Sequence, residues 1–345
     1  SAASDVYKRQ ALIQCLETLC ALNGVSGDEG QVRSYIRGWA EEHADSVRTD
    51  AMGNLIVFKR GRKAAGNRLM LCAHMDSIGF VVTHIEKEGF LRVGRLGGVS
   101  PKEAAYTPVR FKSGLRGVFA PEEKADFGKL KLDECFLDIG AGDEAAAKQL
   151  VQVGDSAVYD APAFRTGDLV VSPYLDGRIS SAVLLSALER IGECLNDLYL
   201  VFTAQEEVGL RGARTAAWSI APDYAVAVDV TDVDDTPGSE RAGTARLGRG
   251  AAVKVMDSSV ICHPAMVALL EDTAREGDIP VQRDIMRGGG TDAGAIHLTR
   301  TGVITGGISV PCRYIHTPTE MADLGDAAAC VKLLAAFAQE ELTRL

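Results

Sequence analysis

Several short apolar runs in this sequence end abruptly at an acidic residue or a histidine. They are residues 69–73 before His74-Met75-Asp76, residues 198–203 before Glu206-Glu207, residues 224–228 before Asp229, and residues 309–315 before His316. A short apolar run of this kind, bounded by polar residues, is typical of a buried strand. In α/β proteins the carboxyl ends of such strands meet at one edge of the sheet, where the chemistry is found. The pattern therefore predicts an α/β enzyme with His, Asp and Glu side chains gathered at that edge.

Composition excludes several other classes of protein. The chain has 345 residues, 24% of them charged, with a net charge of −10 and no Lys/Arg block, so nucleic acid is not an expected partner. No stretch approaches the ~20 apolar residues of a membrane span, and the first residues lack a signal-peptide pattern. The eight cysteines form no C-x-x-C pair and are predicted to be free thiols. We therefore expect a cytoplasmic protein without a membrane partner.

The predicted secondary-structure pattern changes twice along the chain. Residues 12–20 and 32–39 show helical spacing, and the polar residues 26–29 favour a helix start before the second of them. Between residues 78 and 168 short β-like segments alternate with turns, and only residues 144–150 look helical. Strand and helix patterns then return and close with an amphipathic helix over residues 327–342. We predict a catalytic α/β domain from residues 1–77 and 169–345, with residues 78–168 inserted as a β-rich domain.

The residues at the strand ends suit a metal site. Carboxylates and imidazoles without thiolates are ligands for Zn²⁺, Co²⁺ or Mn²⁺ in hydrolytic enzymes. Asp176, at the start of a predicted helix, is the best candidate to bridge two ions. An extended backbone points His74 and Asp76 to the same side, so Asp76 is expected to hydrogen-bond the second nitrogen of His74 rather than a metal. The side chains of Glu206 and Glu207 diverge, which suits one metal ligand and one free carboxylate that acts as a general base.

Each of these residues also has an ordinary structural interpretation. His74 or His316 taken alone fits a hydrogen-bonded structural histidine, and neighbouring glutamates are usually a solvated surface pair. Asp176 could cap a helix, and Asp229 could simply end a strand. The metal hypothesis depends on the set, because each member of it follows a separate apolar run.

At these residues the sequence resembles the tetrahedral aminopeptidases of metallopeptidase family 42, which includes glutamyl, leucyl and deblocking aminopeptidases and some members labelled endoglucanase. The matching motifs are AHMDSIGF (73–80), LDGRI (175–179), TAQEEVGLRGA (203–213), AVDVT (227–231), GGTDAGA (289–295) and RYIHTP (313–318). The resemblance implies an exopeptidase-type mixed sheet flanked by helices, with an inserted PDZ-like dimerisation module. It also implies two metal ions, most commonly Zn²⁺ or Co²⁺.

The resemblance assigns a role to each site residue. It makes Asp176 the bridge, His74 and Asp229 ligands of one ion, and Glu207 and His316 ligands of the other. Glu206 becomes the base that takes a proton from the attacking water, and Asp76 supports His74. The implied activity is release of N-terminal residues from short peptides. It further implies that dimers formed through the module assemble into a hollow tetrahedral dodecamer.

Three positions depart from the family pattern, and other functions stay open. Ser77 stands where the family commonly has an acidic residue, Gly177 where it has Asp or Asn, and Asp232 where it has His. Residues 288–290 are Gly-Gly-Gly and are interpreted as a wall of the active site rather than a phosphate loop, because no Lys-Ser/Thr follows. A dinuclear amidase or deacylase and a non-catalytic metal-binding scaffold are the alternatives. A carbohydrate hydrolase fits less well, since it needs separated carboxylates and no histidine ligands.

Overall fold

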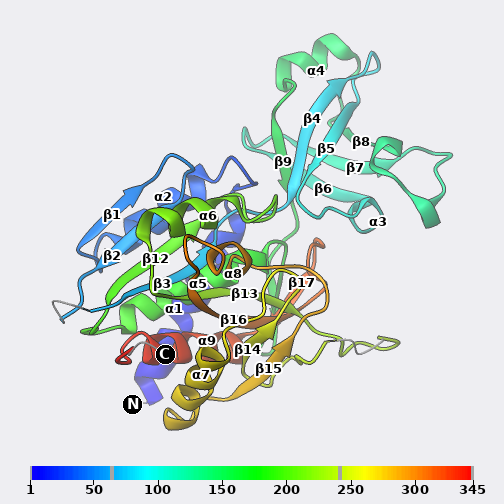
Figure 1. Cartoon of the computed structure of the whole chain (residues 1–345). Helices are drawn as coiled ribbons and strands as arrows, with labels where there is room; N and C mark the ends of the chain where they lie inside the picture. The colour runs from blue at the N-terminus through cyan, green and yellow to red at the C-terminus, as the bar shows by residue number, and fades with distance from the viewer. Residues whose placement is uncertain (1, 63–65, 240–242, 343–345) are drawn as a thin grey trace.

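The computed structural model describes residues 2–62, 66–239 and 243–342. Within these ranges the chain forms a large mixed sheet covered by helices and, standing apart from it, a smaller closed β-barrel (Figure 1). The predicted mixed α/β architecture is confirmed at this level. Residues 1, 63–65, 240–242 and 343–345, which the predicted catalytic domain includes, lie outside the described residues.

The elements follow one another in an irregular alternation of strands and helices. The helices are α1 (Ala2–Ala21), α2 (Gly30–Ala40), α3 (Pro101–Ala104), α4 (Glu144–Leu150), α5 (Leu175–Arg190), α6 (Arg211–Ile220), α7 (Pro264–Glu276), α8 (Ala293–Ile296) and α9 (Leu324–Phe337). The strands of the large sheet are β1 (Ser46–Thr49), β2 (Leu55–Lys59), β3 (Arg68–His74), β10 (Phe164–Thr166), β11 (Leu169–Ser172), β12 (Asp197–Thr203), β13 (Tyr224–Asp232), β14 (Ala251–Met256), β15 (Val281–Ile285), β16 (Ile304–Arg313) and β17 (Glu320–Asp323). The barrel strands are β4 (Gly79–Ile85), β5 (Leu91–Leu96), β6 (Thr107–Phe111), β7 (Arg116–Pro121), β8 (Cys135–Asp138) and β9 (Ser156–Tyr159).

The large sheet has a parallel centre and antiparallel edges. Among the described strands its order is β1-β2-β12-β3-β13-β16-β17-β11-β10, and β14 and β15 extend it from β16. β12, β3, β13 and β16 are parallel to one another, with Thr203 paired to His74 and Asp229 paired to Ser309. Because parallel strands end on the same side, the sheet brings their polar carboxyl ends to one edge. β13 continues past Asp229 to Asp232, so Asp229 lies inside the strand rather than after it.

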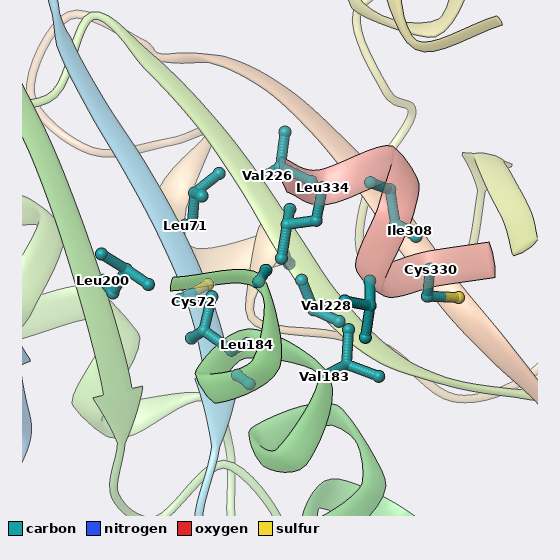
Figure 2. Close-up of a cluster of buried hydrophobic side chains, with 14 of the residues drawn as sticks. Leu71, Cys72, Val183, Leu184, Leu200, Val226, Val228, Ile308, Cys330 and Leu334 are labelled. Atoms are coloured by element: carbon teal, nitrogen blue, oxygen red, sulfur yellow. The ribbon is translucent and has the colours of Figure 1, made fainter. Parts of the chain in front are cut away.

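The core of this part lies between the parallel strands and the helices α5 and α9. Figure 2 shows residues of β3, β13 and β16 against residues of these two helices, among them Leu71, Val183, Val228, Ile308 and Leu334. Burial of a Leu, Ile or Val side chain stabilises the fold by about 1.5–3 kcal/mol, so this layer fixes the strands on which the polar ends are carried. The eight cysteines are buried and unpaired, as predicted. In the part of the chain that is described, no helix is long and apolar enough to cross a membrane.

The barrel is closed in the order β4-β5-β8-β7-β6-β9 and has its own hydrophobic core. Phe80 stacks on Phe119 at 4.9 Å between ring centroids, and Tyr159 meets Phe80 edge-on at 5.7 Å. The helical stretch predicted at residues 144–150 is α4, with Asp143 as its N-cap. The prediction of a single helix in this region is wrong, because α3 also forms, with Ser100 accepting a capping hydrogen bond from the Glu103 amide.

The loop before α2 differs from its sequence-based prediction. α2 begins at Gly30, and the residue before it makes no side-chain capping bond. The Ser26 hydroxyl, expected to help start this helix, instead donates to Asp76 Oδ2 at 2.6 Å. A hydrogen bond to an ionised carboxylate is stronger than one between neutral groups. The Ser26 side chain therefore bonds to Asp76 at the edge of the sheet rather than capping α2.

Candidate metal centre

Two groups of potential metal ligands meet at the carboxyl edge of the parallel strands, and Asp176 belongs to both. The first contains His74, Asp176 and Asp229, and the second contains Asp176, Glu207 and His316. Within each group the ligand atoms all lie within 4.8 Å of one another. The five residues that the sequence suggested as ligands are therefore brought together, from β3, the start of α5, the loop after β12, β13 and the loop after β16.

The first group sits directly on the strand ends. His74 Nε2 lies 2.9 Å from Asp176 Oδ1 and 3.5 Å from Asp229 Oδ1. All three residues are buried. The kink that opens α5 explains how Asp176 reaches this position, since its ψ of 113° and the φ of 14° at Gly177 are not helical.

The second group faces the open side of the site. His316 Nε2 lies 3.1 Å from both Asp176 Oδ2 and Glu207 Oε2. His316 has a φ of 67°, a left-handed conformation that costs a residue with a Cβ free energy and is found at functional sites. The two oxygens of the Asp176 carboxylate therefore point to different histidines.

Asp76 organises the backbone around both groups. Its carboxylate accepts hydrogen bonds from the backbone amides of Glu206 at 2.9 Å and Glu207 at 3.2 Å, and from the Ser26 hydroxyl. Asp76 Oδ1 also lies 3.5 Å from His74 Nδ1. The His74 and Asp76 side chains therefore point to the same side, as expected. At this distance, however, His74 Nδ1 makes no hydrogen bond within the described residues. The sequence argument predicted a hydrogen bond between Asp76 and His74, which is not formed at this distance, and it missed the two amides.

The carboxyl groups of the site oppose one another's ionisation. Burial and the neighbouring Asp176 raise the pKa of Glu207 to about 7. Burial raises the pKa of Glu206 well above its ordinary value, with further contributions from Asp229 and Glu207. Burial alone would lower the pKa of His316, but its hydrogen bonds with Asp176 and Glu207 raise it to about 12. The site thus holds an excess of negative charge that only added cations or protons can balance.

A pocket of about 560 Å³ opens beside the two groups. Its walls include the site carboxylates together with Ser258, Met286, Gly289 and Gly290. Gly289 and Gly290 belong to the glycine run interpreted from sequence as an active-site wall, and they do line this pocket. Glu206 also lines it and belongs to neither group of potential ligands found among the described residues.

The three departures from the family pattern all lie close to the site. Ser77 hydrogen-bonds Gly24 through its amide at 3.0 Å and so ties the loop before α2 to the end of β3. A Cβ added to Gly177 would lie 2.5 Å from the His74 carbonyl oxygen, so the glycine permits this close approach. Asp232 lines the pocket, and burial and Asp176 raise its pKa.

Two features of the site escaped the sequence analysis. Glu320, the first residue of β17, is 1% exposed and accepts hydrogen bonds from the backbone amides of Asp176 and His316. Gly98, in the loop after β5 of the barrel, lies directly against the His316 ring. His297 does not line the pocket and belongs to neither ligand group found among the described residues, and its Nδ1 lies 2.9 Å from the Ala293 carbonyl oxygen.

Comparison with known proteins agrees with this geometry. The family model described as M42 glutamyl aminopeptidase matches residues 53–333. A relative from Acetivibrio thermocellus, named provisionally as an aminopeptidase, is 43% identical over 328 residues, which cover 95% of this chain and 98% of the relative.

Solved structures are similar over almost the whole chain. The aminopeptidase APDkam598 from the archaeon Desulfurococcus kamchatkensis has a TM-score of 0.92 and 37% identity, covering 96% of this chain and 95% of its own. The Pyrococcus horikoshii TET1 peptidase, described as able to assemble into a tetrahedron or a large octahedral shell, has a TM-score of 0.86 and 30% identity, covering 95% and 99%. The family match and these similarities show that the chain belongs to the M42 family of metallopeptidases and is a hydrolase of the aminopeptidase type.

Proposed function

We propose that this protein is a dinuclear metallo-aminopeptidase that releases N-terminal residues from short peptides. The observation that carries the proposal is the Asp176 carboxylate, which presents one oxygen to His74 and the other to His316. A carboxylate shared between two groups of potential ligands is the arrangement that a bridged pair of ions requires. Membership of the M42 family supports the use of divalent metal, and the geometry supports a count of two.

The donor atoms fit such ions. Ligands bound at ~2.0–2.2 Å around a tetrahedral ion lie roughly 3.4 Å apart. The separations found here are 2.9 and 3.5 Å in the first group and 3.1 Å in the second. We assign His74 and Asp229 to one ion, Glu207 and His316 to the other, and Asp176 to both. Nitrogen and carboxylate ligands without sulfur favour Zn²⁺ or Co²⁺.

The residues of the site have different roles in hydrolysis. The bound ions supply Lewis-acid polarisation of the scissile carbonyl, activation of water and an anchor for the free α-amino group. The Glu206 carboxylate takes a proton from the attacking water and returns it to the leaving amine nitrogen. Asp76 holds the Glu206 and Glu207 amides and so fixes where these two carboxylates point. The pocket wall at Gly289 and Gly290 accepts the side chain of the N-terminal residue.

Glu206 separates this proposal from a non-catalytic scaffold, and the substrate separates it from an amidase or deacylase. A metal-binding scaffold has no use for a buried carboxylate that binds no ion, whereas hydrolysis requires one. A dinuclear amidase or deacylase would share every residue of the site, and its substrate would lack the free α-amino group. The rivals therefore differ in which substrates are turned over.

A substrate panel tests the proposal directly. The metal-stripped protein is loaded with Zn²⁺, Co²⁺ or Mn²⁺ and assayed with aminoacyl anilides and with their N-acetyl counterparts. We expect metal-dependent hydrolysis of the free aminoacyl anilides alone. Hydrolysis confined to the N-acetyl compounds would favour the deacylase. No hydrolysis at a stoichiometry of two ions would favour the scaffold.

We further propose that residues 1–77 and 169–345 form the catalytic domain and that residues 78–168 form a PDZ-like oligomerisation domain, whose last strand, β10, joins the edge of the large sheet beside β11. A core in the large sheet and a second core in the barrel support this division, and Val25 and Tyr174 of the catalytic domain pack into the second core. The tetrahedron and the octahedral shell described for the Pyrococcus horikoshii TET1 peptidase support self-association. For this chain we propose a dimer as the building block of a dodecamer. Eight unpaired thiols favour the cytoplasm. Light scattering tests the assembly, because the chain is 36.6 kDa and a persistent monomer at micromolar concentration would contradict it.

A further inference from the structure

Glu320 joins the backbones of two of the proposed metal ligands. Its Oε1 accepts a hydrogen bond from the His316 amide at 2.8 Å, and its Oε2 accepts one from the Asp176 amide at 2.9 Å. The side chain is 1% exposed and comes from the first residue of β17, 144 positions from Asp176 in the chain. Glu320 does not line the pocket and belongs to neither ligand group found among the described residues.

The two amides that Glu320 holds belong to irregular backbone. His316 has a φ of 67°, two residues after Tyr314 with a φ of 59°. Asp176 lies at the kink of α5, two residues after Tyr174 with a φ of 67°. Left-handed residues of this kind persist only where surrounding contacts hold them. Glu320 supplies such a contact to both segments at once.

We propose that Glu320 is a positioning residue for the ligand group formed by Asp176, Glu207 and His316. Its carboxylate fixes the backbones of Asp176 and His316 relative to each other and thereby keeps Asp176 Oδ2 and His316 Nε2 3.1 Å apart. This role rests on the proposed dinuclear function. Because two of the three members of that group are held by Glu320, its loss acts more strongly on the ion bound there than on the ion held by His74 and Asp229.

Glu320→Gln is the informative substitution because it preserves the size of the side chain. The amide oxygen still accepts one backbone hydrogen bond, but the amide nitrogen faces the other backbone N–H, donor against donor. Loss of an outer partner of this kind costs about 10- to 100-fold in metal affinity. Glu320→Asp keeps both acceptor oxygens on a shorter side chain, so we expect it to restore part of the affinity.

Asp326 provides a matched control within the same chain. Its carboxylate is 2% exposed and accepts hydrogen bonds from the backbone amides of Gly248 and Gly250, each at 2.7 Å. None of these three residues lines the pocket. Asp326→Asn therefore removes the same kind of double contact at a place where no metal ligand depends on it.

The test is a Co²⁺ titration of each metal-stripped protein, followed by visible absorption and by competition with a chelator, together with thermal unfolding of the metal-free form. We expect Glu320→Gln to weaken one of the two Co²⁺ ions about 10- to 100-fold, and Asp326→Asn to bind both ions as the wild type does while losing thermal stability. Equal weakening in the two variants, or wild-type binding in a folded Glu320→Gln protein, would overturn the positioning role. If Glu320→Gln does not fold, the same comparison is made with Glu320→Asp. A wild-type protein that binds fewer than two ions would instead refute the dinuclear function.

Discussion

The loop after β5 of the barrel makes the site sensitive to a single methyl group. A Cβ added to Gly98 would lie 2.4 Å from Nδ1 and 2.8 Å from Cε1 of His316, whereas ordinary contacts are 3.4–4 Å. Gly98 does not have a positive φ, so alanine is compatible with its backbone. The neighbouring Gly97 approaches Glu207 in the same way, since its Cβ would lie 3.1 Å from that of Glu207. The three atoms nearest to the added Cβ of Gly98 all belong to the His316 ring, so Gly98→Ala tests contact with His316 and little else.

The size of the effect follows from these distances. To restore an ordinary contact, the imidazole or the loop must move by roughly 1 Å. A displacement of that size at a catalytic centre costs about 100-fold in rate, which corresponds to about 2.7 kcal/mol in the barrier. Because the imidazole ring is rigid, a movement of the ring also displaces Nε2 from its position 3.1 Å from Asp176 and Glu207. We expect Gly98→Ala to lower kcat about 100-fold and to reduce the metal content below that of the wild type.

Gly142→Ala is the control for this prediction. Gly142 lies in the same barrel, it has no positive φ, and nothing lies within 4 Å of its added Cβ. Both variants are compared by anilide hydrolysis, by elemental analysis of bound metal and by circular dichroism. The reasoning is refuted if Gly98→Ala folds, retains full metal content and keeps kcat within twofold of the wild type, or if Gly142→Ala loses as much activity.

Three further outcomes follow from contacts in and near the site. Glu206→Gln should lower kcat by at least ~10²-fold with both metals retained, whereas Glu207→Gln should also lower the metal content; elemental analysis showing the reverse would exchange their roles. Asp76→Asn should weaken metal binding or activity about 10- to 100-fold, and activity within twofold of the wild type at limiting metal would contradict it. Lys254→Met removes the cation that lies 2.5 Å from the buried Asp284 carboxylate and leaves it, within the described residues, only the hydrogen bond from Thr231, so the free energy of unfolding measured in urea should fall by about 3–5 kcal/mol; a fall below about 1 kcal/mol would show that the carboxylate is solvated or neutralised instead.

The ends of the central strands could be predicted because a strand buried on both faces is a nearly continuous apolar run in the sequence. β3, β12 and β13 are almost wholly apolar up to the point where the site begins, and the register that pairs His74 with Thr203 places their ends together. β14 and β15 are not continuous apolar runs, because each contains a charged residue. Lys254 reads as an exposed residue, yet it is 1% exposed and paired with Asp284 of β15. A charge neutralised by a partner 30 residues away cannot be recognised from spacing alone.

Glu320 and Gly98 escaped prediction for a related reason. A glutamate at the start of a strand and a glycine in a turn are common on any protein surface, and their local sequence is compatible with that interpretation. What makes them part of the site is contact with His316, and such contact depends on how β17 and the barrel pack against the end of β16. Long-range packing of this kind leaves no periodic signal in the chain.

The two ligand groups consequently differ in how firmly they are held. His74 and Asp229 sit on neighbouring parallel strands, whose hydrogen bonds and core fix them. Glu207 and His316 sit on loops held from outside, by Asp76, by Glu320 and by the barrel loop at Gly98. We therefore expect a chelator to remove the ion of Glu207 and His316 first, and Gly98→Ala to speed that step while leaving the second unchanged. Release of both ions in a single step from the variant and the wild type alike would contradict this difference.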